Sequence, residues 1–261
     1  MSAEENLRDG KLQDALEDLK VLIRKRPEKS RHRIFYFQLL TVLGQWQPAL
    51  NQLSVIEKLD PATYPMVQTY RAAIRCETLR TEIFSGHKRP LIFGQPLPWI
   101  AWLVESLRLT AASKYAQAVE LRNQAFEQAD ASSGTLDHKP FKWLADADSR
   151  LGPVLEVLLN GQYYWVPFQQ IRSIKISPPE DLRDLVWLPA QFVWVNGSEA
   201  MGLIPTRYPA TEISDDSALQ LARTTKWREV SEGVHLGLGQ RMLATDLDDY
   251  SLFEIREIEM E

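Results

Sequence analysis

The chain is poor in the residues that build metal centres and redox sites. It has a single cysteine, Cys76, among its 261 residues, so it can form neither an internal disulfide nor a thiolate cluster. Its four histidines are scattered, and no two of them are four residues apart. We therefore predict no metal site and no cofactor. Cys76 lies on a helical pattern, where we expect a small buried core residue.

Long apolar runs and targeting signals are also missing. No stretch of about 20 apolar residues occurs, which is the length that a membrane-spanning helix needs. The first five residues lack the basic and then apolar order of a secretory signal. With 44% hydrophobic and 25% charged residues, the chain has the composition of a folded protein with a sizeable core. We expect a cytoplasmic protein that makes no membrane contact.

The common catalytic signatures are absent from the sequence as well. It contains no phosphate-binding glycine-rich loop, no HExxH pair and no GxSxG elbow. One dense polar group, formed by Asp146, Asp148 and Arg150, could supply paired carboxylates to a hydrolase or transferase. Carboxylates two residues apart on one segment do not converge by themselves, and no histidine stands nearby. We favour a capping aspartate and an arginine ion pair at an interdomain junction, with the enzyme as the alternative.

What the chain does contain is an internal repeat of 34 residues. Gly10, Ala15 and Pro27 recur as Gly44, Ala49 and Pro61. A period of about 34 with a glycine turn, a helix-packing alanine and a closing proline is the tetratricopeptide pattern of two antiparallel helices per unit. Glycine suits the turn between the helices, and proline ends the second helix because it has no N–H to donate. Ser113, Tyr115 and Ala118 repeat the spacing, which predicts a third, degenerate unit.

The second half has a different period. From Ala131 to Lys139 the composition shifts to Ser, Gly, Thr and Asp, as in a linker. The pattern then alternates with a period of two, and we expect strands on both sides of Asn160-Gly161 and of Asn196-Gly197, each in a type I′ turn. Residues 171–176 and 252–258 look like further strands, and residues 215–223 like a helix.

These patterns predict a multidomain α+β protein. Residues 1–130 form tetratricopeptide-like helical repeats, 131–150 a linker or junction, and 151–261 a small β-rich, barrel-like domain. The charge is divided the same way: the first 130 residues carry 18 Lys/Arg and 15 Asp/Glu, and the rest carry 12 and 20. The halves therefore differ in chemistry as well as in secondary structure.

A basic stretch from Arg24 to Arg33 could indicate a nucleic-acid-binding protein. It holds six cations in ten residues, and such clusters can meet phosphates. In the repeat, however, this stretch is a helix end, a turn and the next helix start, all facing water. The chain as a whole is acidic, with a net charge of −5. We expect no nucleic-acid partner, and keep nucleic-acid binding as a second alternative.

Three strings in the second half resemble a known protein family. They are Phe141-Lys-Trp-Leu-Ala-Asp-Ala-Asp-Ser-Arg-Leu-Gly-Pro153, Asn160-Gly-Gln-Tyr-Tyr-Trp-Val-Pro167 and Leu203-Ile-Pro-Thr-Arg-Tyr-Pro209. The chain is similar here to the ImpE/TagJ family, accessory proteins of bacterial type VI secretion, and the resemblance takes in the helical half too. It implies a non-enzymatic cytoplasmic adaptor that binds the N-terminal helix of the small contractile-sheath subunit and is linked to the ClpV ATPase.

That implied role agrees with a groove of stacked helices, which can receive an amphipathic helix through anchors at i, i+3, i+4 and i+7. In tetratricopeptide units the first helix of each pair lines the concave face. Counting back from Gly44 and applying the same offset in the next unit gives the expected contacts. They are Arg31, Ile34, Gln38, Thr41, Val42, Gln68, Ala72 and Arg75.

Overall fold

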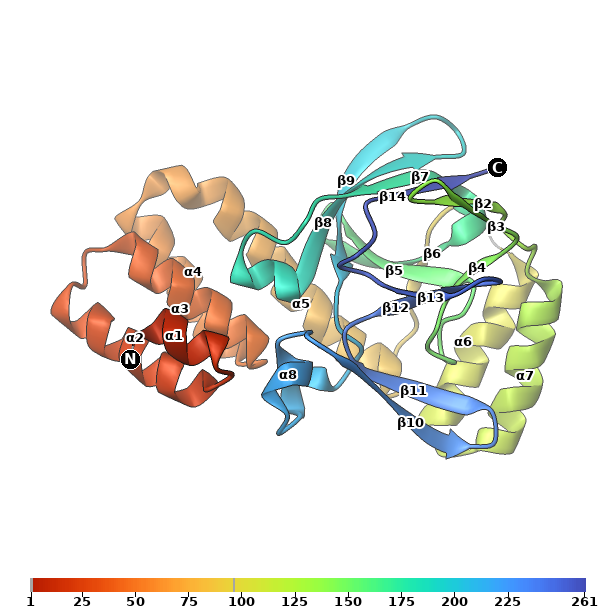
Figure 1. Cartoon of the computed structure of the whole chain (residues 1–261), viewed down its shortest axis with the longest axis horizontal. Helices are drawn as coiled ribbons and strands as arrows, with labels where there is room; N and C mark the ends of the chain where they lie inside the picture. Colours follow the sequence, from red (N-terminus) through yellow and green to blue (C-terminus); the bar gives the residue numbers. More distant parts are fainter. Residues whose placement is uncertain (1, 96) are drawn as a thin grey trace.

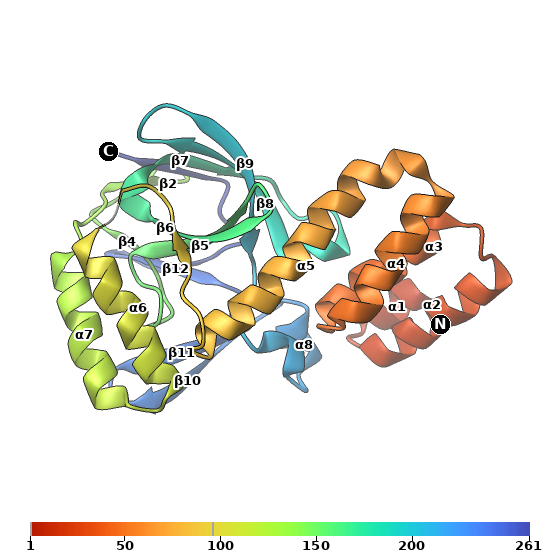
Figure 2. The same cartoon turned by 180° about the vertical axis from the view of Figure 1, so that it is seen from behind.

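The computed structural model describes residues 2–95 and 97–261 and has an α+β architecture. The N-terminal helices gather at one end of the molecule, and the sheets lie at the other end together with a further helical hairpin, as Figure 1 shows. A long helix, α5, runs between the two parts, which is clearest from behind in Figure 2. Within the described ranges, no helix has both the length and the apolar character needed to cross a membrane.

The helical part is built from hairpins. Its elements are α1 (Ala3–Arg8), α2 (Leu12–Lys25), α3 (Ser30–Val42), α4 (Trp46–Leu59), the short η1 (Pro61–Thr63) and α5 (Tyr64–Phe84). A further hairpin, α6 (Pro98–Ala111) and α7 (Tyr115–Gln128), lies beside the sheets at the far end of the molecule. It therefore does not continue the stack of α1 to α4, although its sequence echoes theirs.

The repeat spacing is explained by a shared turn. Gly10, Gly44 and Ser113 each end the first helix of a hairpin in the left-handed region, with φ of +75°, +64° and +58°. Each turn also has the hydrogen bond from the next residue's N–H back to the carbonyl five positions earlier, the helix-ending motif that glycine favours. A left-handed residue costs little at glycine and more at serine. The offset thus encodes a helix–turn–helix unit.

The main sheet is open. Nine described strands form it in the order β1-β6-β5-β9-β8-β7-β14-β2-β3, antiparallel except between β1 and β6. Their bounds are β1 Leu91–Ile92, β2 Gly134–Leu136, β3 Lys139–Phe141, β5 Val154–Leu159, β6 Gln162–Pro167, β7 Ile171–Ile176, β8 Trp187–Trp194, β9 Glu199–Pro205 and β14 Glu257–Met260. The expected barrel is not formed, because the two edge strands, β1 and β3, do not pair with each other. The segment expected as a linker, 131–150, supplies β2, β3 and β4.

The remaining strands form two smaller sheets. β4 (Leu144–Asp146), β12 (Met242–Thr245) and β13 (Asp249–Ser251) form a three-stranded sheet, and β10 (Thr225–Ser231) pairs with β11 (Val234–Gly239). Short helices complete the part: η2 (Phe168–Gln170), η3 (Leu182–Leu185), η4 (Thr211–Ile213) and α8 (Ser217–Gln220). The strand predicted over 252–258 is wrong for most of its length: the chain turns at 252–254, and only residues 257 and 258 lie in a strand, β14.

The two predicted tight turns differ. Asn160 and Gly161, between β5 and β6, both have positive φ, +50° and +75°, as a type I′ turn requires. Between β8 and β9 only Gly197 is left-handed, with φ of +82°. Asn196 instead uses its side chain, whose Oδ1 accepts from the N–H of Ser198 at 2.9 Å and from its hydroxyl at 2.7 Å. The prediction of a second type I′ turn is therefore wrong.

The segment 206–224 ties the sheet part to both N-terminal hairpins. Arg207 donates from Nη1 and Nη2 to the carbonyls of residues 42 and 41, at 2.7 and 3.4 Å. Arg223 donates in the same way to the carbonyls of residues 8 and 7, at 2.9 and 3.1 Å. These carbonyls are 34 positions apart and end α1 and α3, where the helix dipole attracts a cation. One arginine thus binds each copy of the repeat.

Candidate partner-binding site

Much of the predicted concave face is covered by the protein itself. Gln38, Thr41 and Val42 on α3 are buried, with exposed fractions of 5%, 0% and 0%. The prediction that they line an open groove is wrong, because η3 packs against α3 and Arg207 binds the end of that helix. Partner contact would require displacing these elements.

Aromatic side chains fill the remaining space on that face. The ring of Trp187, at the start of β8, lies 5.7 Å from that of Tyr70 and 6.0 Å from that of Trp46. The guanidinium of Arg183 lies 4.8 Å above the Tyr70 ring, an attractive cation–π geometry. The face of the helical hairpins that was predicted to be an open groove therefore holds the sheet part.

The predicted residues on α5 do lie together at an open groove. Gln68, Ala72 and Arg75 line a cavity of about 580 Å³ between α5 and the sheet, opposite the β5–β6 turn and strands β8 and β9. Gln68 and Arg75 are exposed and Ala72 is half-buried. The other two predicted residues, Arg31 and Ile34, do not line this groove. Arg31 is exposed elsewhere on α3, and Ile34 packs against the core.

The groove has the character of an interaction surface. Its apolar wall includes Leu158, Leu203 and Met201, and Met201 is 66% exposed. Arg75 forms no ion pair with another described residue, so its charge is free to meet a carboxylate. Gly161 brings the β5–β6 turn close to α5: a Cβ there would lie 3.3 Å from that of Ala72. The side of α5 that faces the groove is thus lined by small and polar residues.

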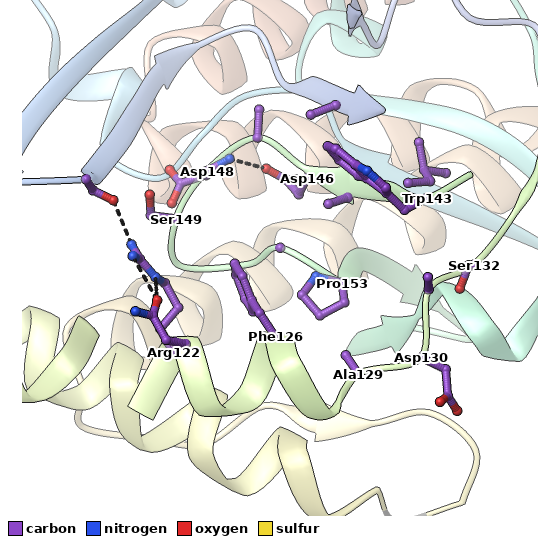
Figure 3. A pocket seen from close by; sticks show the side chains of 18 residues that line it. Arg122, Phe126, Ala129, Asp130, Ser132, Trp143, Asp146, Asp148, Ser149 and Pro153 are labelled. Carbon is purple, nitrogen blue, oxygen red and sulfur yellow. Dashed lines mark hydrogen bonds between the residues drawn. The ribbon is translucent and has the colours of Figure 1, made fainter. Parts of the chain in front are cut away.

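Asp146 and Asp148 lie in the buried interior beside another pocket, drawn in Figure 3. Asp146 is bound by Arg241 and accepts the Tyr208 hydroxyl at 3.1 Å. Asp148 forms an ion pair with Arg150, whose Nε donates to Oδ1 of Asp148 at 2.8 Å. Burial raises the pKa of Asp146 to about 6 despite the arginine. With exposed fractions of 3% and 0%, both carboxylates are occupied by the protein's own arginines and do not form an open acid–base pair.

A buried ion cluster that sequence reasoning missed joins α5 to the sheet. Glu156 on β5 accepts from Nε and Nη2 of Arg80 at 2.6 and 2.9 Å, and also from Arg241 and the Tyr163 hydroxyl. Burial favours the neutral acid, but the charges of the two arginines prevail and lower the pKa of Glu156 to about 2. The signal for this cluster in the sequence was Glu156, a single charged residue inside the apolar run of 154–159.

The same cluster fixes α5 in place. Arg80 also donates to the carbonyl of Arg207 at 2.8 Å, and Trp187 Nε1 donates to Glu77 on α5 at 2.9 Å. Burial raises the pKa of Glu77. Because α5 is held by buried bonds from several strands, the groove along its exposed side is preformed and does not depend on a flexible linker.

The basic stretch from Arg24 to Arg33 forms the end of α2, a turn and the start of α3. Arg33 folds back onto the turn, where its Nε donates to the carbonyl of Pro27 at 3.2 Å. Its Nη1 donates to Gln52 on α4 at 3.2 Å. The arginine at the end of the stretch therefore helps to hold the α2–α3 connection.

Comparison with known proteins gives consistent matches. A family model described as ImpE protein matches residues 138–259. The chain is 49% identical, over all of its length and 92% of the relative, to the type VI secretion system accessory component TagJ of Pseudomonas aeruginosa. A crystal structure of a protein from Vibrio parahaemolyticus superposes with a TM-score of 0.90 at 25% identity, covering 99% of this chain and 97% of that one. The match thus extends over both the helical and the sheet parts.

Proposed function

The chain belongs to the ImpE/TagJ family of type VI secretion accessory components, and we propose on this basis that it is a non-enzymatic cytoplasmic adaptor. In this proposal it binds the N-terminal helix of the small contractile-sheath subunit. It thereby connects the sheath to its disassembly by the ClpV ATPase. Because Gln38, Thr41 and Val42 on the predicted groove are buried, the proposal places the partner helix elsewhere.

The observation that carries the proposal is the groove beside α5. Gln68, Ala72 and Arg75 follow one face of a helix at i, i+4 and i+7, the spacing at which one helix meets another. An amphipathic helix would place its apolar side chains against Leu203 and Met201. An acidic residue of that helix would then pair with Arg75. Because the groove is preformed, little ordering free energy opposes binding.

Isothermal titration calorimetry with a synthetic peptide of the sheath subunit's first helix tests the proposal. We expect binding at micromolar concentration, and we expect Arg75→Glu to weaken it at least about tenfold by placing like charges together. Arg31→Glu is the matched control, because it makes the same charge change on an exposed site outside the groove. If the two variants bound the peptide with equal affinity, the α5 groove would not be its binding site.

A second measurement concerns ClpV. A complex of the chain with the sheath peptide is expected to bind ClpV in pull-down experiments, and Arg75→Glu should remove the peptide from that complex. Gln38→Arg is unsuitable as a binding probe, because Gln38 is 5% exposed and a buried charge there would destabilise the fold itself. Absence of any heat with the peptide at tens of micromolar would contradict the adaptor function.

A further inference from the structure

A second cavity lies at the other end of the molecule, between α7 and β4. Its volume is about 530 Å³. Figure 3 shows its floor, formed by Arg122 and Phe126 on α7 and by Ala129 and Asp130 just after the end of that helix, with Trp143 on the opposite side. This cavity is separate from the α5 groove, with which it shares no lining residue.

The middle of the cavity is apolar and partly open to water. Phe126 and Trp143 are 37% and 40% exposed, although large aromatic side chains usually gain several kcal/mol from burial. Phe126 is held in place by Gly152, since a Cβ on that glycine would lie 2.2 Å from the ring. Two half-exposed aromatic rings at one opening suit an inserted apolar side chain.

One wall of the cavity is a strand with free backbone groups. The N–H of Ala147 donates to Met242 of β12, and orientation alternates along an antiparallel pair, so Leu144 and Asp146 turn their backbone groups away from β12. The N–H of Asp146 donates to the carbonyl of Gly152 at 2.7 Å. β4 is the edge strand of its three-stranded sheet on this side, and the N–H and C=O of Leu144 bond to no turn, loop or side chain in the described part of the chain. A backbone donor and acceptor at a sheet edge beside an apolar cavity suit a peptide main chain.

The two ends of the cavity carry opposite charges. Arg122 lies toward Ser149, and Asp130 toward Ser132 (Figure 3). Arg122 donates to the carbonyl of Gly233 at 2.9 Å but pairs with no carboxylate in the described part of the chain. Partial burial lowers its pKa, as expected for a cation without an anionic neighbour. A carboxylate is the complementary group at that end.

We propose that this cavity, lined by Arg122, Phe126, Ala129, Trp143 and Leu144, binds a short extended peptide of a partner protein. The peptide inserts one large apolar side chain between Phe126 and Trp143. It exchanges main-chain hydrogen bonds with Leu144. A carboxylate on the peptide, toward the Ser149 end, pairs with Arg122. The chain would then hold two partners at once, a helix along α5 and an extended segment beside α7.

A random heptapeptide display library, selected against the whole protein, is the probe. We expect enriched peptides to share one aromatic or large aliphatic residue and one Asp or Glu. Ala129→Trp fills the cavity and should weaken these peptides at least about tenfold. The matched control is Ala116→Trp, an exposed position on α7 that does not line the cavity, and it should bind as the unmodified protein does.

Further variants separate the interactions. Arg122→Ala should weaken an acidic peptide about tenfold but leave its amide analogue, with Asn or Gln, unchanged. Trp143→Ser, on the surface, serves as a second cavity variant if Ala129→Trp fails to fold by circular dichroism. N-methylation of the peptide bond next to the apolar residue should abolish binding.

Three results would overturn the proposal. The first is a library from which nothing is enriched by the unmodified protein over Ala129→Trp. The second is a set of peptides that binds both proteins equally. The third is a dimer in sedimentation experiments that Ala129→Trp disperses, since the cavity would then receive a second copy of this chain.

Discussion

Glu156→Gln removes the central anion of the buried cluster while keeping the shape of the side chain. In the native protein the carboxylate accepts from Arg80, Arg241 and Tyr163. The amide retains one acceptor oxygen, but its NH₂ group faces a donor, and two buried guanidinium groups lose their shared counter-charge. The variant should therefore fold with much lower stability.

The magnitude follows from the pKa of Glu156. The fold lowers it from 4.5 to about 2, and at about 1.36 kcal/mol per pH unit this corresponds to about 3 kcal/mol. Removing one partner of a buried ion pair usually costs about 3 to 5 kcal/mol, which agrees with the value from the pKa. Because the folded pKa is depressed, this stabilisation is fully present above pH 4.5 and is lost as the pH falls toward 2.

Urea unfolding followed by circular dichroism measures the effect. At pH 7 the variant should unfold with a free energy about 3 kcal/mol below that of the unmodified protein, and the difference should shrink between pH 4.5 and 3. Glu259→Gln, an exposed glutamate in the same sheet, should change stability by less than about 0.5 kcal/mol. A loss below about 1 kcal/mol at pH 7, or a difference that grows in acid, would refute the reasoning.

Other parts of the fold give further predictions. Gly44→Ala should destabilise by about 2 to 3 kcal/mol, against about 1 for Gly197→Ala: both glycines are left-handed, but only at Gly44 does the new Cβ meet a side chain, Glu212, at 2.6 Å. Thermal unfolding of the pair checks this ranking. Arg207→Ala should cost about 2 to 3 kcal/mol and speed amide exchange at the end of α3, which mass spectrometry would detect. Burial raises the pKa of Cys76 to about 11, so iodoacetamide at pH 8 should label it slowly in the native protein and rapidly in urea.

Local signals predicted local structure well. The repeat glycines mark left-handed turns because few other residues adopt that conformation, and Asn160-Gly161 forms the expected type I′ turn for the same reason. Asn196 shows the limit of this reasoning. Its side chain can satisfy the turn by accepting from Ser198, so the same dipeptide supports more than one geometry.

Contacts between distant segments could not be predicted in this way. Gln38 has the helical position of a groove residue, but whether it is open depends on η3, which lies well over a hundred residues later in the chain. Arg80 and Arg241 reach Glu156 across 76 and 85 positions. Only Glu156 itself was visible in advance, as a charge in an apolar strand. The strings that carried the family resemblance contain several members of this buried cluster, including Asp146, Tyr163 and Arg207.

Arg207 and Arg223 bind equivalent carbonyls in successive hairpins, and this pairing constrains how many hairpins the helical part can have. Proteins made of stacked units commonly gain or lose a unit with little penalty, since each one touches only its neighbours. Here the deletion or duplication of one 34-residue unit would leave an arginine facing the wrong helix end. The number of N-terminal hairpins is therefore fixed by a loop that is encoded more than 160 residues away from α3.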